Sequence, residues 1–438
     1  THRSAEKEES GEALAEGGKG GGEPEETLPV VSESLDIATL DYGEKRSRIV
    51  EESPAMEPQP ADERAMGGDA DTEWNTEEYM RIYENDFLSV MENPVSTFSI
   101  DVDTASYSNV RRFIRNGSLP LADAVRIEEL VNYFSYDYPQ PSDSHPFAFH
   151  TEISECPWNG NNRLIHIGMQ GKRIPAAQLP PGNFVFLIDV SGSMNQDNKL
   201  PLLKEAFALL VENMRQQDRV AIVVYAGAAG VVLPPTSGAE KAAILSALER
   251  LSAGGSTAGG AGLELAYATA LEHFSTRANN RVIIATDGDF NVGPSSTSEL
   301  VRLVEARRDA GIYLTVLGFG MGNYKDSRME ELADRGNGNY AYIDTAAEAR
   351  KVLVEELGAT LFAIARDVKL QIEFNPAHVD AYRLIGYENR MLAREDFEDD
   401  AKDAGELGAG HTVTALYEIV PAKRGEARKD ESRYVETT

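Results

Sequence analysis

The chain is 438 residues long, carries a formal charge of −30 and has a pI of about 4.6. An acidic surface of this kind argues against nucleic acid and anionic lipid as partners, because phosphates bind to basic faces. Hydrophobic residues make up 42% of the chain, so its length allows two or three domains with buried cores.

Residues 1–75 form an acidic tail that we expect to be disordered. They hold 20 Asp and Glu against 7 Lys and Arg, with a glycine-rich run at 17–22 and a proline-rich run at 57–60. Such a composition cannot bury enough apolar surface to offset chain entropy. The tail is similar to the tether of a lipoprotein, which predicts the bacterial cell envelope, periplasmic or outer-surface, as the location. We expect any anchor or targeting signal to lie outside this sequence, in which no stretch approaches the ~18 apolar residues of a membrane helix.

Residues 76–181 predict an α+β region. Apolar spacing and alternation predict helices over 77–91, 106–115 and 122–134, and strands over 96–102, 147–153 and 163–170. The helix over 122–134 should bury an apolar face made of Ile127, Leu130, Val131 and Phe134. The single cysteine, Cys156, excludes an internal disulfide and predicts a small buried side chain.

Residues 182–365 alternate between buried strands and amphipathic helices. The expected strands are 184–190, 220–225, 231–233, 281–286, 313–319 and 340–343, and the expected helices are 202–214, 241–251, 262–274, 297–310, 327–335 and 346–365. We expect the short strand over 231–233 to end at Pro234. This succession predicts an α/β fold with a doubly wound, mostly parallel, Rossmann-like sheet and helices on both faces. Ligands of such sheets bind at the carboxyl ends of the strands.

Residues 366–438 return to a β pattern. Strands are predicted over 367–374, 380–385 and 412–420, with an acidic insert over 395–406. We expect these strands and the N-terminal ones to pack together as a β-rich domain that flanks the α/β domain. The polar stretch after Pro421 predicts that this last domain is incomplete.

Oxygen-bearing side chains gather at three predicted strand and loop ends. The first strand of the α/β domain ends in Asp189, with Ser191 and Ser193 directly after it, a glycine-rich loop supplies Thr257, and a later strand ends before Asp287. Each serine alone could cap a helix, and Asp287 alone could form a turn. Together these hard oxygen ligands suit Mg²⁺, Mn²⁺ or Ca²⁺, and the absence of Cys and His argues against zinc or copper. Two carboxylates leave the metal electron-poor, so a carboxylate from a partner should complete its coordination.

These five residues resemble the metal-ion-dependent adhesion site of von Willebrand factor type A and integrin inserted domains. Further segments resemble the bacterial YfbK-like proteins, which pair a type A domain with their own N- and C-terminal domains; these segments are 93–112, 218–227, 254–262 and 317–326. The resemblance covers about residues 76–421. It implies that Ser191 and Ser193 bind the metal directly, that Thr257 does so when a partner is engaged, and that Asp189 and Asp287 act largely through water.

The expected function is therefore divalent-cation-dependent protein binding, without catalysis, small-molecule substrate or nucleic acid. One alternative is an accessory subunit of an AAA+ ATPase, since type A domains also present substrates to such motors. Another is a Mg²⁺-dependent phosphatase, because Asp101 and Asp103 in the run 98–104 mimic the DxDxT motif of haloacid-dehalogenase phosphatases. The series of later strands that such a phosphatase needs is missing. We therefore expect both aspartates to cap the next helix or to bind a structural cation.

Overall fold

The computed structural model describes residues 77–255, 259–288, 297–321, 325–356, 363–399 and 404–423. The predicted acidic tail lies outside these ranges. None of the helices within them combines the length and the apolar character needed to span a membrane.

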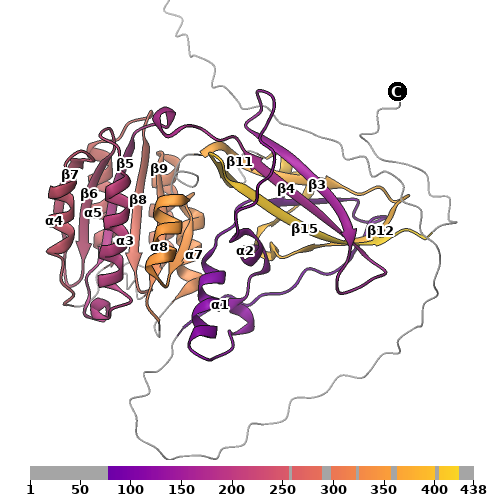
Figure 1. Ribbon diagram of the computed structural model, residues 1–438, viewed down its shortest axis with the longest axis horizontal. Helices are drawn as coiled ribbons and strands as arrows, with labels where there is room; N and C mark the ends of the chain where they lie inside the picture. Colours follow the sequence, from indigo (N-terminus) through magenta and orange to yellow (C-terminus); the bar gives the residue numbers. More distant parts are fainter. Residues whose placement is uncertain are drawn as a thin grey trace, which may run out of the picture. The chain divides into compact units, whose positions relative to one another are not determined.

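A six-stranded sheet with the order β10-β9-β8-β5-β6-β7 forms the centre of the α/β domain (Figure 1). Its strands are β5 (Gly182–Asp189), β6 (Arg219–Tyr225), β7 (Ala229–Ser237), β8 (Asn279–Thr286), β9 (Ile312–Phe319) and β10 (Tyr340–Ile343). All neighbours pair in parallel except β6 and β7. β5 lies between β6 and β8, so the strand order reverses beside it, and the predicted doubly wound, mostly parallel sheet is confirmed.

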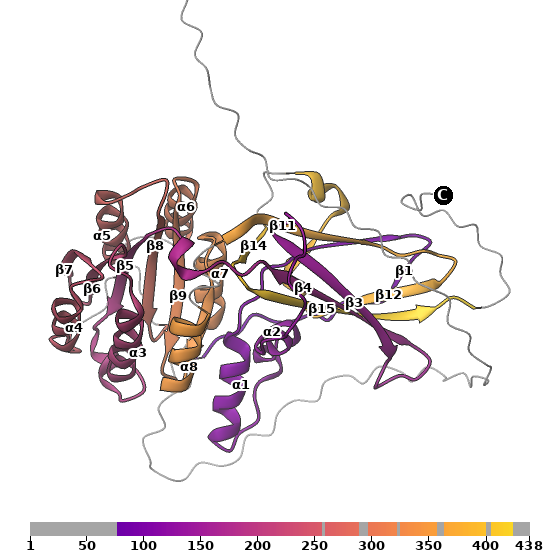
Figure 2. The ribbon, with the colours of Figure 1, turned by 45° about the horizontal axis from the view of Figure 1, so that its top comes forward.

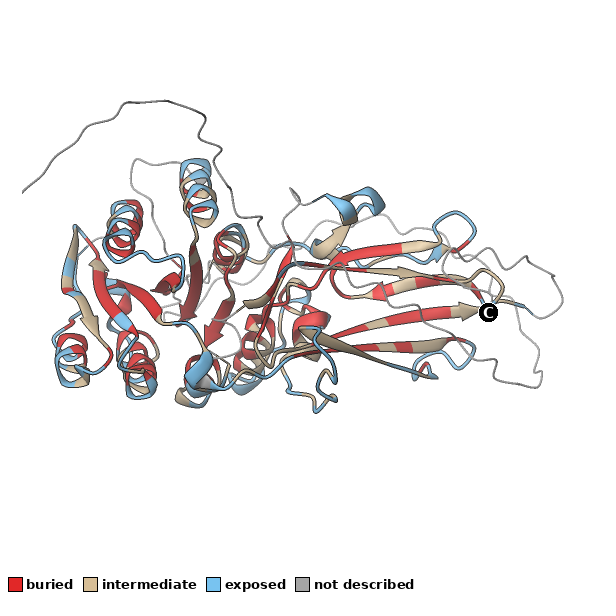
Figure 3. Cartoon of the chain, turned by 90° about the horizontal axis from the view of Figure 1, so that it is seen from above, coloured by how far each residue is buried: buried red, intermediate tan, exposed pale blue. Residues whose placement is uncertain are grey.

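Helices cover both faces of this sheet, and Figure 2 shows α5 and α6 on one side and α3 and α4 on the other. The helices are α3 (Leu200–Asn213), α4 (Lys241–Glu249), α5 (Gly259–Glu272), α6 (Thr297–Asp309), α7 (Asp326–Arg335) and α8 (Ala346–Arg350). Alternate residues of each strand join two separate hydrophobic clusters, one on each face. Because both faces are covered, β5, β8, β9 and β10 are buried along almost their whole length, whereas the edge strand β7 is mostly half-buried or exposed (Figure 3).

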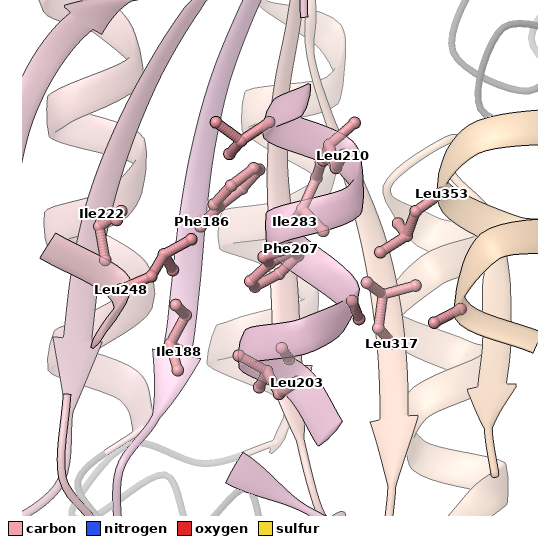
Figure 4. Packing of buried hydrophobic residues seen from close by; sticks show 14 of the residues in the cluster. Phe186, Ile188, Leu203, Phe207, Leu210, Ile222, Leu248, Ile283, Leu317 and Leu353 are labelled. Atoms are coloured by element: carbon pink, nitrogen blue, oxygen red, sulfur yellow. The ribbon is translucent and has the colours of Figure 1, made fainter. Parts of the chain in front are cut away.

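The packing of α3 against the sheet fixes the position of the carboxyl end of β5. The predicted metal ligands lie at and directly after this end. Leu203, Phe207 and Leu210 point toward β5 in Figure 4, and the rings of Phe207 and Phe186 stack with centroids 4.2 Å apart. These side chains are almost fully buried. The loop between β5 and α3 is therefore held at both ends by the core.

β7 is longer than the sequence predicts. It continues through Pro234 to Ser237, with register shifts against β6. β7 is an edge strand, where a proline without an N–H group removes no hydrogen bond from a second neighbour. The prediction that the prolines end this strand is therefore wrong.

N-terminal and C-terminal segments together build two antiparallel sheets, which confirms the predicted flanking β-rich part. Their orders are β1-β12-β15-β4-β3 and β13-β2-β11-β14. The strands are β1 (Leu88–Ser89), β2 (Val95–Ser99), β3 (Phe147–Glu155), β4 (Arg163–Gly171), β11 (Ala363–Glu373), β12 (Val379–Ile385), β13 (Met391–Leu392), β14 (Gly405–Gly408) and β15 (Thr412–Pro421). β15 pairs with β4, and β11 pairs with β2, so strands from both ends of the chain share one core.

Residues 77–91 form no helix, and the helix predicted there is wrong. The segment is irregular except for an isolated bridge at Glu78, the two-residue strand β1, which pairs with β12, and a turn that begins at Val90. The side-chain amide of Asn85 donates to the carbonyls of Leu384 and Gly386. Tyr83 is 70% exposed and Met91 63% exposed, so the helical spacing of apolar residues does not mark a buried stripe. Contacts with a distant strand thus hold this segment in place of helical bonds.

The prediction for residues 122–134 is also wrong about which face of the helix is buried. A 3-10 turn (Ala122–Ala124) precedes the short helix α2 (Ile127–Asn132), in which Glu128 and Glu129 are buried while Ile127 is exposed. Glu129 accepts a hydrogen bond from the backbone N–H of Ser106 at 2.8 Å and pairs with Arg126. Buried carboxylates persist when charge partners and donors satisfy them. Helix α1 (Ala105–Arg115) precedes this turn, as predicted.

The last predicted helix, over 346–365, ends earlier in the structure. α8 is followed by a single π-helical turn (Lys351–Glu355), and residues 357–362 lie outside the described part of the chain. β11 already begins at Ala363, where it pairs with β14. Pairing with a strand more than forty residues further along the chain thus decides the conformation of residues 363–365. Cys156 is buried, as predicted.

Candidate metal centre

The two predicted carboxylate ligands follow neighbouring strands of the central sheet. Asp189 is the last residue of β5, and Asp287 comes directly after the last residue of β8. β5 and β8 pair in parallel with Ile188 opposite Ala285, so both aspartates lie at the carboxyl edge of the sheet. Both side chains are fully buried.

The carboxylate of Asp189 is held by three donors. The backbone N–H of Ser191 donates to Oδ1 at 2.8 Å, and the hydroxyls of Tyr225 and Thr286 donate to Oδ2 at 3.1 and 3.2 Å. Burial raises the pKa of Asp189 above its ordinary value, and the hydrogen bonds from Ser191 act in the opposite direction. Tyr225 and Thr286 were not predicted as site residues, although both stand at the ends of strands that flank Asp189.

The two serine hydroxyls lie at a separation that suits a small octahedral cation. Oγ of Ser191 and Oγ of Ser193 are 3.0 Å apart. Mg²⁺ takes oxygen ligands at about 2.1 Å in octahedral geometry, which places adjacent ligands about 3.0 Å apart. The longer bonds of Ca²⁺, at about 2.4 Å, would separate octahedral neighbours by about 3.4 Å. The two hydroxyls share a hydrogen bond at this distance and thus stand close enough to be neighbouring ligands of one divalent cation.

The glycine-rich loop reaches the same turn. The N–H of Gly192 donates to the carbonyl of Gly255 at 3.2 Å, and the N–H of Gly254 donates to the carbonyl of Val190 at 2.7 Å. Gly255 has a φ of +92°, which favours glycine. Thr257, the ligand predicted from this loop, lies outside the described residues, so its part in the site stays a prediction.

Lys199 is a residue of the site that was not predicted. Its Nζ donates to Oδ2 of Asp287 at 2.9 Å, and its side chain is 3% exposed. Lys199 directly precedes α3, at a helix N-terminus where the helix dipole disfavours a positive charge. Lys199 stands outside the ligand motif, so no signal in the sequence ties it to Asp287.

The chemistry of the gathered side chains is that of a hard-cation site. Two carboxylates and two hydroxyls meet at one edge, without a thiol or an imidazole. Within the described ranges no cluster, this one included, offers a metal three or more His, Cys, Asp or Glu side chains, so the hydroxyls would have to supply part of the donor set. The residues present thus fit a divalent cation at the position that the doubly wound fold makes available for ligands.

Asp101 and Asp103 make contacts of a structural kind. The guanidinium of Arg390 lies 3.3 Å from Asp101 and 3.5 Å from Asp103, and Asp103 accepts the backbone N–H of Tyr340 at 2.7 Å. The N-cap of α1 is Thr104, without a side-chain cap. The expected capping role is therefore wrong. The positive charge beside these two aspartates is the guanidinium of Arg390.

Comparison with known proteins identifies the class. Residues 183–356 match the family of the von Willebrand factor type A domain, residues 73–166 match a family described as von Willebrand factor, and residues 359–438 match the C-terminal domain of YfbK. The chain is a von Willebrand factor type A domain protein.

Within this class the chain belongs to the YfbK-like proteins. It is 47% identical over 351 residues to the protein YfbK of Escherichia coli (strain K12), which covers 78% of this chain and 61% of that one. It is 27% identical over 189 residues to the protein sll0103 of Synechocystis, covering 43% of this chain and 44% of that one. The chain thus spans about half to three fifths of the length of these relatives. A solved von Willebrand factor type A structure from Catenulispora acidiphila matches with a TM-score of 0.41 and 20% identity, over 65% of this chain and 67% of that one.

Proposed function

We propose that this chain is a divalent-cation-dependent protein-binding module, and that Asp189, Ser191, Ser193, Thr257 and Asp287 hold the cation. Type A domains generally mediate metal-dependent protein–protein interaction and are typically not enzymes. The observation that carries the proposal is the pair of serine hydroxyls 3.0 Å apart beside two buried carboxylates at the carboxyl edge of the sheet.

The partner in this proposal is a protein that presents an Asp or Glu side chain. The bound cation supplies the positive charge that attracts this carboxylate. Two buried aspartates neutralise a divalent cation, and Lys199 adds one positive charge beside them, so the loaded site favours one further anionic oxygen. The cation of this proposal is Mg²⁺, with Mn²⁺ or Ca²⁺ as the alternatives that hard oxygen ligands also suit.

Loops around the site would select the partner. We assign this role to the loops 194–198 and 227–230, and to the loop 290–293, which lies outside the described residues. The loop after β9 adds Met321, which is 44% exposed and lies 3.7 Å through its sulfur from the side-chain nitrogen of Asn116. Residues after α1 therefore border the same face as the metal centre, which supports a contact surface shared by both regions.

The proposed location is the bacterial cell envelope, with the acidic tail as a tether. The support is compositional: the tail combines a net charge of −13 with a glycine-rich run, a composition similar to that of a lipoprotein tether. Fractionation of cells that express the natural full-length protein tests this. We expect the protein in the envelope fraction, and recovery in the cytosol alone would contradict the proposal.

A pull-down from envelope extract tests the binding function. The full chain serves as bait in Mg²⁺ or in EDTA, as wild type, Asp189→Ala and Asp309→Ala. Asp309 is a largely exposed aspartate at the end of α6, outside the loops of the site, and serves as a control. We expect one set of partners that wild type and Asp309→Ala retain in Mg²⁺ and that EDTA and Asp189→Ala release. Partners that survive EDTA unchanged would overturn the proposal.

A phosphatase role has no support from the site of Asp101 and Asp103. Both carboxylates face Arg390, and Asp103 is buried against the backbone of Tyr340. We expect no Mg²⁺-dependent hydrolysis of a phosphate monoester by the wild type, and none that Asp101→Asn changes. Hydrolysis lost in Asp101→Asn would contradict this expectation.

A further inference from the structure

We infer that Lys199 is a built-in counter-cation of the metal site, which lowers the affinity for the divalent cation and raises the affinity of the loaded site for a partner carboxylate. This inference rests on the proposed metal-dependent binding function. A single side chain, that of Lys199, would then lower the affinity for the metal and raise the affinity for the partner.

The ammonium of Lys199 is placed by the fold and is not a flexible surface group. Nζ lies 2.9 Å from Oδ2 of Asp287, with side chains 3% and 0% exposed. The stem of Lys199 runs along Gly320, where an added Cβ would collide with its Cγ, Cδ and Cε. Gly320 has a φ of +79°, and its carbonyl accepts a hydrogen bond from the buried hydroxyl of Tyr342. The loop after β9 thus leaves room for the lysine and is itself held in place.

Burial strengthens the electrostatic effect of the Lys199 ammonium on the metal site. In water a neighbouring lysine is screened, whereas charges in a protein interior interact through a lower effective dielectric constant. A divalent cation at the predicted ligands stands beside Asp287 and therefore close to the ammonium of Lys199, and the two repel each other. The lysine already neutralises Asp287 before any metal arrives, so the metal gains less from that carboxylate.

The charge balance shows how the partner gains from the same lysine. Among the described residues of the site, Asp189 and Asp287 contribute two negative charges and Lys199 one positive charge, so these three groups sum to −1. A divalent cation brings the loaded site to +1, and a single carboxylate brings it to neutrality. Without Lys199 the loaded site would already be neutral, and the incoming carboxylate would leave it at −1. Lys199 therefore matches the site to one monovalent anionic group.

The sign of the effect of Lys199→Met separates this role from a structural one. If Lys199 only supported the loop, its removal would loosen the site and weaken metal binding. As a counter-cation, its removal strengthens Mn²⁺ binding by roughly tenfold or more, given the short distance and the buried setting. Lys199→Arg keeps the charge and should bind Mn²⁺ with an affinity within a few-fold of the wild type.

The experiment is a Mn²⁺ titration of the full chain, with free Mn²⁺ measured by electron paramagnetic resonance. The titration compares the wild type with Lys199→Met, Lys199→Gln and Lys199→Arg. The control is Lys204→Met, which removes one positive charge from α3. The ammonium of Lys204 contacts the carbonyls of Glu249 and Leu251. A second titration adds acetate to the Mn²⁺-loaded proteins and follows the loss of metal-bound water by proton relaxation. We expect tighter Mn²⁺ and several-fold weaker acetate binding in the neutral Lys199 variants alone.

The outcomes distinguish the inference from the function on which it rests. If the wild type binds Mn²⁺ and both neutral variants bind it equally or more weakly, the counter-cation role is overturned and the metal site stands. If Lys204→Met strengthens Mn²⁺ binding as much as Lys199→Met, a general charge effect replaces the specific one and the inference fails. If no protein binds Mn²⁺, including the wild type, both the proposed function and the inference fail.

Discussion

Arg126 donates from both of its terminal nitrogens to Oδ2 of Asp326, each at 2.9 Å, and so joins the residue before α2 to the first residue of α7. The side chains are 5% and 1% exposed. Asp326 also accepts the hydroxyl of Tyr340 at 2.8 Å, and Glu129 and Glu330 stand beside the same guanidinium. One arginine therefore compensates several buried carboxylates where the N-terminal region meets the type A domain.

Removal of this arginine should destabilise the protein strongly. Arg126→Met leaves Asp326, Glu129 and Glu330 buried without their common cation, and breaking a buried ion pair from one side costs about 3–5 kcal/mol. Urea unfolding at neutral pH measures the loss. Arg173→Met is the control, because Arg173 and its partner Asp137 are both largely exposed, and we expect it to cost less than about 1 kcal/mol. A similarly small loss in the free energy of unfolding of Arg126→Met would contradict the role of Arg126 as the common partner of the buried carboxylates.

Glu128 should make stability depend on pH. Burial raises its pKa to about 7, and its Oε2 has no hydrogen-bond partner among the described residues. A carboxyl whose folded pKa lies above its unfolded value of 4.5 contributes stability below that value, which is lost as the pH rises through about 7. Glu128→Gln should therefore be more stable than the wild type at pH 8 and not at pH 4.5.

The measurement is the urea midpoint at both pH values, in EDTA to exclude metal effects. Glu92→Gln provides the comparison, because Glu92 is exposed, and its midpoints should follow those of the wild type. Equal midpoints of Glu128→Gln and the wild type at pH 8 would refute the prediction.

Tyr225 should tune metal affinity through Asp189. Tyr225→Phe removes the hydroxyl that donates to Oδ2 of Asp189 at 3.1 Å, and loss of a hydrogen bond to a metal ligand typically lowers metal affinity by about 10- to 100-fold. Calorimetric titration with Mg²⁺ measures this affinity. Tyr267→Phe is a matched control, because Tyr267 is equally buried and its hydroxyl has no hydrogen-bond partner within the described residues. Identical affinities of Tyr225→Phe and Tyr267→Phe would show that the hydrogen bond does not act on the metal.

The sequence predicted the central sheet well because its signals are local. The continuous apolar run of β5 and the apolar faces of α3 and α5 are each visible within one element, and the doubly wound topology then places Asp189 and Asp287 at one edge. The strand pairing of the flanking sheets was predicted only in outline, because it joins residues that lie far apart in the chain, such as Lys369 with Ser99 and Thr412 with Gln170.

The misjudged elements are those in which a distant partner decides the structure. Arg126 lies 200 positions from Asp326, and this pairing places the charged face of α2 inside, against the apolar pattern. Lys199 was missed for a similar reason, since Asp287 lies 88 positions away. The lysine also stands outside the ligand motif, where only the structure shows that its charge is buried.

The most direct test of the metal centre is a Mg²⁺ titration of the metal-free full chain by calorimetry, as wild type and as Asp189→Ala. The account predicts one Mg²⁺ bound per wild-type chain and no measurable binding by Asp189→Ala, with circular dichroism spectra of the two proteins superimposable. Equal Mg²⁺ binding by a folded Asp189→Ala, or no Mg²⁺ and no Mn²⁺ binding by the wild type, would contradict it.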